Sequence, residues 1–103
     1  MSEYEVGRFD EFVDGAAINR RINGRELVFI RIGNSLYVLD DRCSHEEFPL
    51  SLGEVDVANC SIECERHGAS FHLSDGTPAS FPATQPVPTH DVTLRDGNVY
   101  VEL

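Results

Sequence analysis

The fold is decided by the stretch Ala17-INRRINGRELVFIRIGNSLYV-Leu39, in which three apolar segments are separated by two pairs of turn residues. Asn23-Gly24 is a pair that two-residue hairpin turns prefer, and Gly33-Asn34 has the same turn-forming composition. Between them, Glu26–Ile32 is rich in β-branched and aromatic side chains, which favour strands. The stretch therefore predicts three antiparallel strands, over Ala17–Ile22, Glu26–Ile32 and Ser35–Leu39.

The same spacing of strands and turns continues at both ends of the chain. The segment Tyr4–Val6 indicates an opening strand, with Arg8–Phe12 as a candidate extension. At the other end, His90–Leu94 and Asn98–Leu103 flank Asp96-Gly97, a strong hairpin signal. A turn every 8–12 residues or so is typical of all-β domains, so we expect a small β-sandwich or barrel.

The middle of the chain, Asp40–Ser80, has shorter predicted strands and more polar loops. These strands cover Gly53–Val57, Cys60–Glu63 and Ser70–Leu73. Three prolines follow (Pro82, Pro86, Pro88), and because proline lacks an amide donor we expect a stiff loop there. We therefore predict one domain of residues 1–103, with a β scaffold of about 1–40 and 88–103 and an inserted, loop-rich subdomain of about 41–87.

The inserted subdomain carries two short motifs, Cys43-Ser44-His45 and Cys64-Glu65-Arg66-His67, separated by residues 46–63. Each motif places one thiol and one imidazole on a short loop, and both groups are ligands of soft and borderline metals. A structural zinc site accepts two thiolates and two imidazoles, but usually takes like ligands from one loop or both histidines from a helix. The mixed pairs favour a two-iron cluster, in which one iron takes both cysteines and the other both histidines.

These motifs resemble those of Rieske-type 2Fe–2S ferredoxins, the electron carriers associated with aromatic-ring-hydroxylating dioxygenases. The resemblance extends to Gly68, to the turn at Asp75-Gly76 and to the segment Pro82-ATQPV-Pro88, which in that family caps the cluster. The resemblance is close in the second half of the chain. In the first half it concerns the layout of the predicted strands. The segment between the motifs is at the long end for these ferredoxins.

The resemblance implies that Cys43 and Cys64 hold the inner iron, and His45 and His67 the outer iron, of one cluster per chain. Two neutral histidines leave the oxidised centre less negative than four thiolates would. Its reduction potential should therefore lie above that of plant-type ferredoxins, which is roughly −400 mV.

High-potential Rieske proteins differ from this chain at four places. They carry an extra cysteine in each ligand loop, joined as a disulfide, where this chain has Phe48 and Arg66. They also place hydroxyl groups two and four residues after the second histidine, where this chain has Ala69 and Phe71. Hydrogen bonds to the sulfurs stabilise the reduced cluster and so raise its reduction potential. Because this chain lacks these hydroxyl donors, we expect a potential on the order of −150 mV, the low end of the Rieske range.

The composition limits the partners and the compartment. A net charge of −10, from 18 acidic against 8 basic residues, argues against nucleic acid and against an anionic membrane surface. No apolar run approaches the roughly 20 residues that span a bilayer, and the first residues lack the pattern of a signal peptide. With only three cysteines a disulfide framework is not expected, and we interpret the protein as cytoplasmic.

The remaining chemically distinctive residues have simpler interpretations. We expect Cys60 to be a buried, small apolar residue within a strand, and His72 and His90 to belong to the scaffold or surface. Phe71 and Phe81 should be core residues. A further apolar group either shields the cluster or forms a docking rim: Phe48, Leu50 and Leu52. An acidic belt that could guide a basic reductase is predicted from Asp40, Asp41, Glu46, Glu47, Glu54, Asp56, Glu63 and Glu65.

Nothing in the sequence resembles independent catalytic machinery, so we expect an electron carrier and not an enzyme. The family resemblance implies transfer of one electron from a flavin-dependent reductase to a terminal non-haem iron oxygenase, by a monomeric protein in transient complexes. Three alternatives stay open. They are a Rieske protein of a Suf-type iron–sulfur assembly system, a protein like the small subunit of nitrite reductase, and a structural zinc module.

Overall fold

The computed structural model describes residues 2–42, 48–64, 68–79 and 85–103. These residues form strands and two short 3-10 helices, η1 (Phe9–Glu11) and η2 (Leu50–Leu52). The strands are β1 (Glu3–Arg8), β2 (Ala17–Ile22), β3 (Arg25–Ile32), β4 (Ser35–Asp40), β5 (Glu54–Asp56), β6 (Ser61–Glu63), β7 (Ser70–His72), β8 (Thr89–His90), β9 (Val92–Arg95) and β10 (Asn98–Glu102). The predicted all-β fold is confirmed, and no helix in the described part of the chain is long and apolar enough to cross a membrane.

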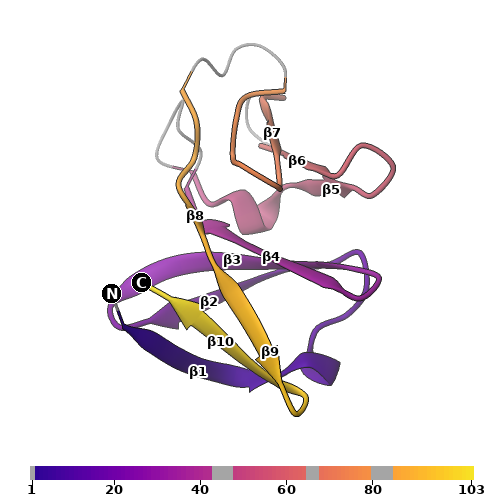
Figure 1. Ribbon diagram of the computed structural model, residues 1–103. Coiled ribbons are helices and arrows are strands. Elements are labelled where there is room, and N and C mark those ends of the chain that lie inside the picture. The colour runs from indigo at the N-terminus through magenta and orange to yellow at the C-terminus, as the bar shows by residue number, and fades with distance from the viewer. Residues whose placement is uncertain (1, 43–47, 65–67, 80–84) are drawn as a thin grey trace.

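The strands form three antiparallel sheets (Figure 1). Sheet order is β1-β10-β9 in the first, β2-β3-β4-β8 in the second and β5-β6-β7 in the third. The first sheet contains both ends of the chain and lies at one end of the molecule, while the third lies at the opposite end. The second sheet therefore occupies the middle of the molecule.

The central strand β3 separates two hydrophobic cores. Leu27 and Phe29 pack on one side with residues of β4 and β10, while Val28 and Ile30 pack on the other with residues of β6 and β7. All four side chains are fully buried, because successive residues of a strand point to opposite faces and both faces of β3 are covered. The unbroken apolar run in the sequence is the signature of this position.

Some strand predictions were wrong in their bounds, and two of them, over Arg8–Phe12 and His90–Leu94, were wrong for identifiable reasons. The candidate extension Arg8–Phe12 is instead the helix η1, which begins after a register shift between Glu5 and Gly7 of β1. The carboxylate of Glu11 accepts a hydrogen bond from the amide of Arg8 at 3.1 Å and so favours the helical turn.

The predicted strand over His90–Leu94 is divided at Asp91. β8 pairs with β4 in the second sheet, whereas β9 pairs with β10 in the first. The chain therefore changes sheets at Asp91, whose carbonyl accepts a hydrogen bond from the amide of Glu102 at 2.9 Å.

The proposed division into a scaffold and a subdomain of about 41–87 stays a prediction.

Candidate metal centre

Cys64 follows β6 directly and is fully buried. Its amide donates a hydrogen bond to the carbonyl of Ala69 at 2.6 Å, which continues the pairing of β6 with β7 by one residue beyond Glu63 and Ser70. The amide of Gly68 donates to the carbonyl of Cys64 at 2.9 Å, and Gly68 has φ +70°, a left-handed conformation that suits glycine. Two backbone hydrogen bonds thus hold Cys64 next to Gly68 and Ala69.

The other three predicted ligands, Cys43, His45 and His67, lie outside the described residues, so the structure places Cys64 alone. What it does describe are the residues that flank each of the three segments 43–47, 65–67 and 80–84. One hydrophobic core contains residues near all three segments, namely Leu50, Cys64, Ala69 and Val87, with Phe48 packed against it. The flanks of the two ligand motifs and of the proline segment therefore meet in one core.

The flanks of the proline segment are held by backbone hydrogen bonds. The amide of Ala79 donates to the carbonyl of Ser70 at 2.7 Å, and the amide of Val87 donates to the carbonyl of Gly76 at 2.8 Å. Gly76 lies so close to the carbonyl oxygen of Val87 that a Cβ would stand 1.9 Å from it. Only glycine allows this approach, which explains the Asp75-Gly76 turn that the sequence singled out.

The turn before that segment has its own polar support. The carboxylate of Asp75 accepts hydrogen bonds from the hydroxyl of Thr77 at 2.7 Å and from its amide at 3.0 Å. These hydrogen bonds stabilise the ionised carboxylate and hold the pKa of Asp75 below its usual value.

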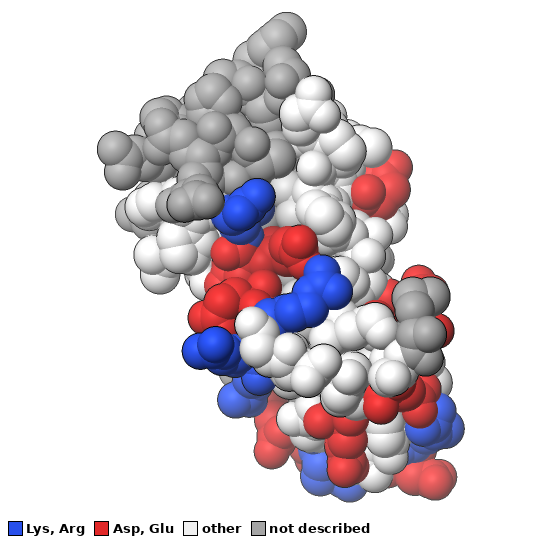
Figure 2. Space-filling model, turned by 90° about the vertical axis from the view of Figure 1, so that its left-hand side faces the viewer, with Lys and Arg blue, Asp and Glu red and all other residues white. Residues whose placement is uncertain are grey.

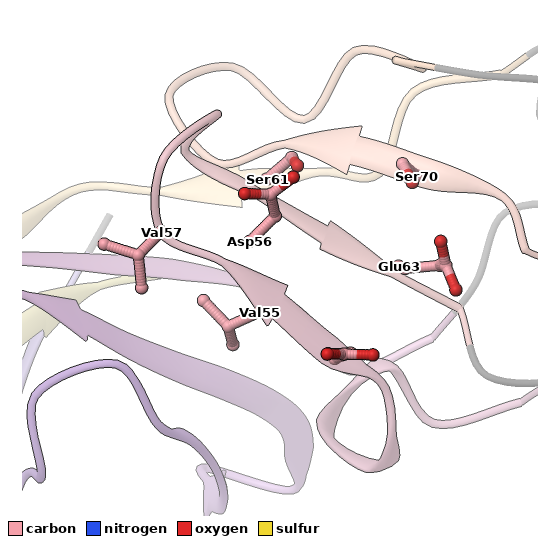
Figure 3. A pocket seen from close by; sticks show the side chains of 7 residues that line it. Val55, Asp56, Val57, Ser61, Glu63 and Ser70 are labelled. Carbon is pink, nitrogen blue, oxygen red and sulfur yellow. The ribbon is translucent and has the colours of Figure 1, made fainter.

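The predicted acidic belt is present only in part. Glu54, Asp56 and Glu63 are exposed and line a hollow of about 330 Å³ on sheet β5-β6-β7 (Figure 3). Hydrogen bonds from the side chain and backbone of Asn59 lower the pKa of Asp56. Among the described residues, no group of three or more histidine, cysteine, aspartate or glutamate side chains is arranged to hold a metal ion.

Two members of the predicted belt are not free surface charges. Asp41 is buried, with 7% of its surface exposed, and its carboxylate is hydrogen-bonded within the protein. Asp40 is half-buried and contacts Arg25 and His90. On the face shown in Figure 2, acidic and basic side chains lie next to each other instead of forming an unbroken acidic surface. Glu46, Glu47 and Glu65 lie outside the described residues.

The prediction for Cys60 needs correction. Cys60 is not in a strand: it is the last residue of the turn before β6, has φ +52° and is only partly buried. A hydrogen bond with Cys60, followed by burial, raises the pKa of Tyr37 above its ordinary value. The turn is fixed by the amide of Leu73, which donates to the carbonyl of Cys60 at 3.0 Å.

The other interpretations can now be compared with the structure. Phe71 is a core residue, as predicted, while Phe81 lies outside the described residues. His72 is exposed on β7. Leu50 is fully buried and belongs to the core around Cys64, whereas Leu52 is 60% exposed, so the two leucines of η2 have different roles.

Sequence reasoning missed the residues that fix the flanks. Gly53 approaches the carbonyl oxygen of Glu63 so closely that a Cβ would stand 1.9 Å from it, which joins η2 to the strand preceding Cys64. Asp41, directly after β4, is connected to η2 by the hydrogen bonds that its carboxylate accepts from Ser51. A glycine next to a strand is a weak signal for such an approach, and nothing in the sequence distinguishes Asp41 from the adjacent Asp40.

Comparison with known proteins agrees with this architecture. Residues 2–91 match the model of the Rieske [2Fe-2S] domain. The chain is 34% identical over 102 residues to the 3-phenylpropionate/cinnamic acid dioxygenase ferredoxin subunit of Photorhabdus laumondii, covering 98% of this chain and 94% of that protein. It superposes on the ferredoxin of carbazole 1,9a-dioxygenase from Nocardioides aromaticivorans with a TM-score of 0.94 and 28% identity, over 98% of this chain and 97% of that one.

A second solved structure, a complex of reduced oxygenase and oxidized ferredoxin in carbazole 1,9a-dioxygenase, matches with a TM-score of 0.88 and 32% identity. That match covers 96% of this chain and 91% of the other. The chain belongs to the Rieske 2Fe–2S domain family.

The cofactor of this family is a Rieske-type 2Fe–2S cluster, and the described residues fit it. The Cys64 thiol is fully buried in one core with Leu50, Ala69 and Phe71, and an apolar shell of this kind limits the access of solvent to a metal site. The two-thiol, two-imidazole donor set of the sequence is the one that Rieske centres use.

Proposed function

We propose that this protein is a ferredoxin that carries one electron from a flavin-dependent reductase to a terminal non-haem iron oxygenase of an aromatic-ring dioxygenase system. It is an electron carrier and not itself a catalyst. The observation that carries the proposal is the near end-to-end match to ferredoxins of such systems, in sequence and in structure. A match over the full length of a relative is a stronger argument than a shared domain within a larger protein.

The proposed ligands are Cys43 and Cys64 for the inner iron and His45 and His67 for the outer iron. When bound, the cluster accepts and returns a single electron. The protein contributes a dry environment for the sulfur side, because Cys64 is fully buried in an apolar core. Exposed imidazoles would leave the other side open to partners, so we expect both partners to approach His45 and His67.

The proposal includes the state of the protein in the cell. We propose a cytoplasmic monomer that forms transient complexes with the reductase and the oxygenase. The net charge of −10 supports attraction to basic partner surfaces, and mixed charges on the face in Figure 2 would give such contacts a defined orientation.

The test begins with anaerobically purified protein, in which iron and acid-labile sulfide are measured and the reduced form is examined by EPR. We expect two irons and two sulfides per chain, a Rieske spectrum, and electron transfer to an oxygenase in the presence of a flavin reductase. His67→Ala should abolish the Rieske spectrum. The matched variant His72→Ala, on the exposed surface of β7, should leave it unchanged.

Two of the alternatives, the zinc module and the assembly protein, each predict a different result of that experiment. A zinc module would contain stoichiometric zinc and give no EPR signal on reduction. A protein of an iron–sulfur assembly system would show the Rieske spectrum but fail to support oxygenase turnover. Either result would overturn the proposed function.

A further inference from the structure

The carboxylate of Asp41 joins three parts of the chain that are separate in sequence. Its Oδ1 accepts a hydrogen bond from the amide of Ser51 at 2.7 Å, and its Oδ2 accepts one from the hydroxyl of Ser51 at 2.6 Å. Oδ2 also accepts a hydrogen bond from the side-chain amide of Asn19 at 2.5 Å. The backbone amide of Asp41 donates to the carbonyl of Glu26 at 3.0 Å, so both ends of the residue are fixed.

Asp41 and Ser51 stand on either side of the first ligand motif in the sequence. Asp41 precedes Cys43 by two residues, and Ser51 is the middle residue of η2, ten residues after Asp41. Asn19 belongs to β2 in the central sheet. The Asp41–Ser51 contact therefore joins the chain before residues 43–47 to the chain after them, and Asn19 attaches Asp41 to the sheet.

Residues next to Ser51 connect the Asp41–Ser51 contact to Cys64. Leu50, next to Ser51, is fully buried in the same core as Cys64. Gly53 donates its amide to the carbonyl of Leu50 at 2.8 Å and lies directly against the backbone of Glu63, the residue before Cys64. Fixing Ser51 therefore fixes the base of one ligand motif relative to the start of the other.

A carboxylate suits this position better than an amide does. Three donors converge on two oxygens, and an ionised carboxylate accepts at both of them. An asparagine would offer one oxygen and would turn its NH2 group toward a donor, leaving at least one hydrogen bond unmade in a buried site. The exposed fraction of Asp41, 7%, means that water can replace little of what is lost.

We propose that Asp41 is a positioning residue for the cluster: it holds the Cys43–His45 motif in the place where it can share a metal centre with Cys64. The proposal rests on the proposed ligand set. It has a second consequence, because a buried negative charge two residues from a sulfur ligand disfavours the addition of an electron to the centre. Asp41 should therefore both retain the cluster and keep its reduction potential low.

The experiment compares Asp41→Asn with Asp56→Asn in cluster-loaded protein. The control removes the same charge from a carboxylate that also accepts hydrogen bonds from an amide and a side chain, but that is exposed on β5. We expect Asp41→Asn to lose its iron to a chelator several-fold faster than the wild type. Its midpoint potential should move to a more positive value and its EPR spectrum should change, while Asp56→Asn matches the wild type in all three.

A merely structural role for Asp41 would give a different pattern. The variant would then unfold at a lower temperature, yet its folded fraction would keep the wild-type midpoint, spectrum and rate of iron loss, and this result would overturn the proposal.

If Asp41→Asn holds no cluster, the variant Ser51→Ala tests the proposal instead. It keeps the charge of Asp41 and the hydrogen bond from the amide of residue 51, and it removes only the hydrogen bond from the hydroxyl. Iron loss from Ser51→Ala should be faster than from the wild type, and an equal rate would overturn the proposal. A wild-type protein without sulfide would instead contradict the ligand set itself.

Discussion

The Nε2 atom of His90 lies 2.7 Å from Oδ1 of Asp40, and this contact joins the two places where the chain passes between the central sheet and the region of the ligand motifs. Asp40 ends β4 and His90 ends β8, the two strands that pair at this point (Figure 1). The amide of Asp40 also donates to the carbonyl of Pro88 at 3.0 Å. The segment that leaves the central sheet and the segment that returns to it are thus joined by a backbone hydrogen bond and by a side-chain contact.

Replacing His90 with leucine should therefore destabilise the protein. The side chain of His90 is 11% exposed and that of Asp40 is 30% exposed, so water would replace only part of the hydrogen bond that the Asp40 carboxylate loses. We expect the free energy of unfolding to fall by about 1–3 kcal/mol, measured by chemical denaturation followed by circular dichroism. His72→Leu, at an exposed site, should change it by no more than about 0.5 kcal/mol. Equal losses in the two variants would show that the Asp40 contact contributes nothing.

Gly53 should tolerate substitution poorly although its backbone conformation is ordinary. Its φ is −83°, but an added Cβ would stand 1.9 Å from the carbonyl oxygen of Glu63, a backbone atom that cannot move aside alone. Gly33 provides the opposite control, since its φ is +61° and no atom lies within 4 Å of an added Cβ. We expect Gly53→Ala to cost about 3 kcal/mol and Gly33→Ala about 1–2 kcal/mol.

Because Gly53 lies against the residue before Cys64, the two variants should also differ in cofactor content. Gly53→Ala should be purified with less iron per chain than Gly33→Ala, as measured by a colorimetric iron assay. Full iron occupancy in Gly53→Ala, with unchanged stability, would mean that this close approach is not needed for the site.

Much of the scaffold follows from local signals in the sequence. Asn23-Gly24 and Asp96-Gly97 were predicted as hairpin turns, and both pairs have the left-handed φ values that such turns require. The apolar run of β3 predicted a strand, and its burial on both faces explains why the run has no polar alternation. These features depend on neighbours in sequence, which is why they can be read from it.

The contacts that fix the candidate site depend on residues far apart in sequence. Asp40 and Asp41 are adjacent and chemically identical, yet one is paired with His90 and the other is buried against Ser51 and Asn19. The change of sheet at Asp91 likewise depends on which strand is available as a partner, β4 or β10. Such choices are made by tertiary packing, so a single sequence does not reveal them.

The reduction potential should lie at the low end of the Rieske range, on the order of −150 mV. The two positions at which high-potential proteins carry hydroxyl groups are Ala69 and Phe71, and both are fully buried apolar residues. Neither side chain can donate a hydrogen bond to a sulfur. A redox titration followed by EPR measures the midpoint, and a strongly positive value would contradict the prediction.

Phe71→Tyr tests the cause of the low potential directly. The added hydroxyl would supply a donor in the core that contains Cys64, so the midpoint should move to a more positive value. Phe12→Tyr is the matched control, because Phe12 is equally buried but belongs to the other hydrophobic core. Identical midpoints in the two variants would point to a cause other than missing hydrogen bonds.

The hydrogen bond between Tyr37 and Cys60 should be visible in the titration of the tyrosine. This hydrogen bond is the largest cause that raises the pKa of Tyr37 above its ordinary value of 10.0, followed by burial, whereas a hydrogen bond with Ser35 lowers it. Cys60→Ala should therefore move the pKa of Tyr37 down toward 10.0, and Ser35→Ala should move it up. Because a raised pKa favours the protonated form in the folded state, the contribution to stability is present below pH 10 and is lost as the pH rises through the folded-state pKa. NMR signals of the Tyr37 ring recorded against pH measure both shifts, and a pKa that does not fall in Cys60→Ala would rule out the thiol as its main cause.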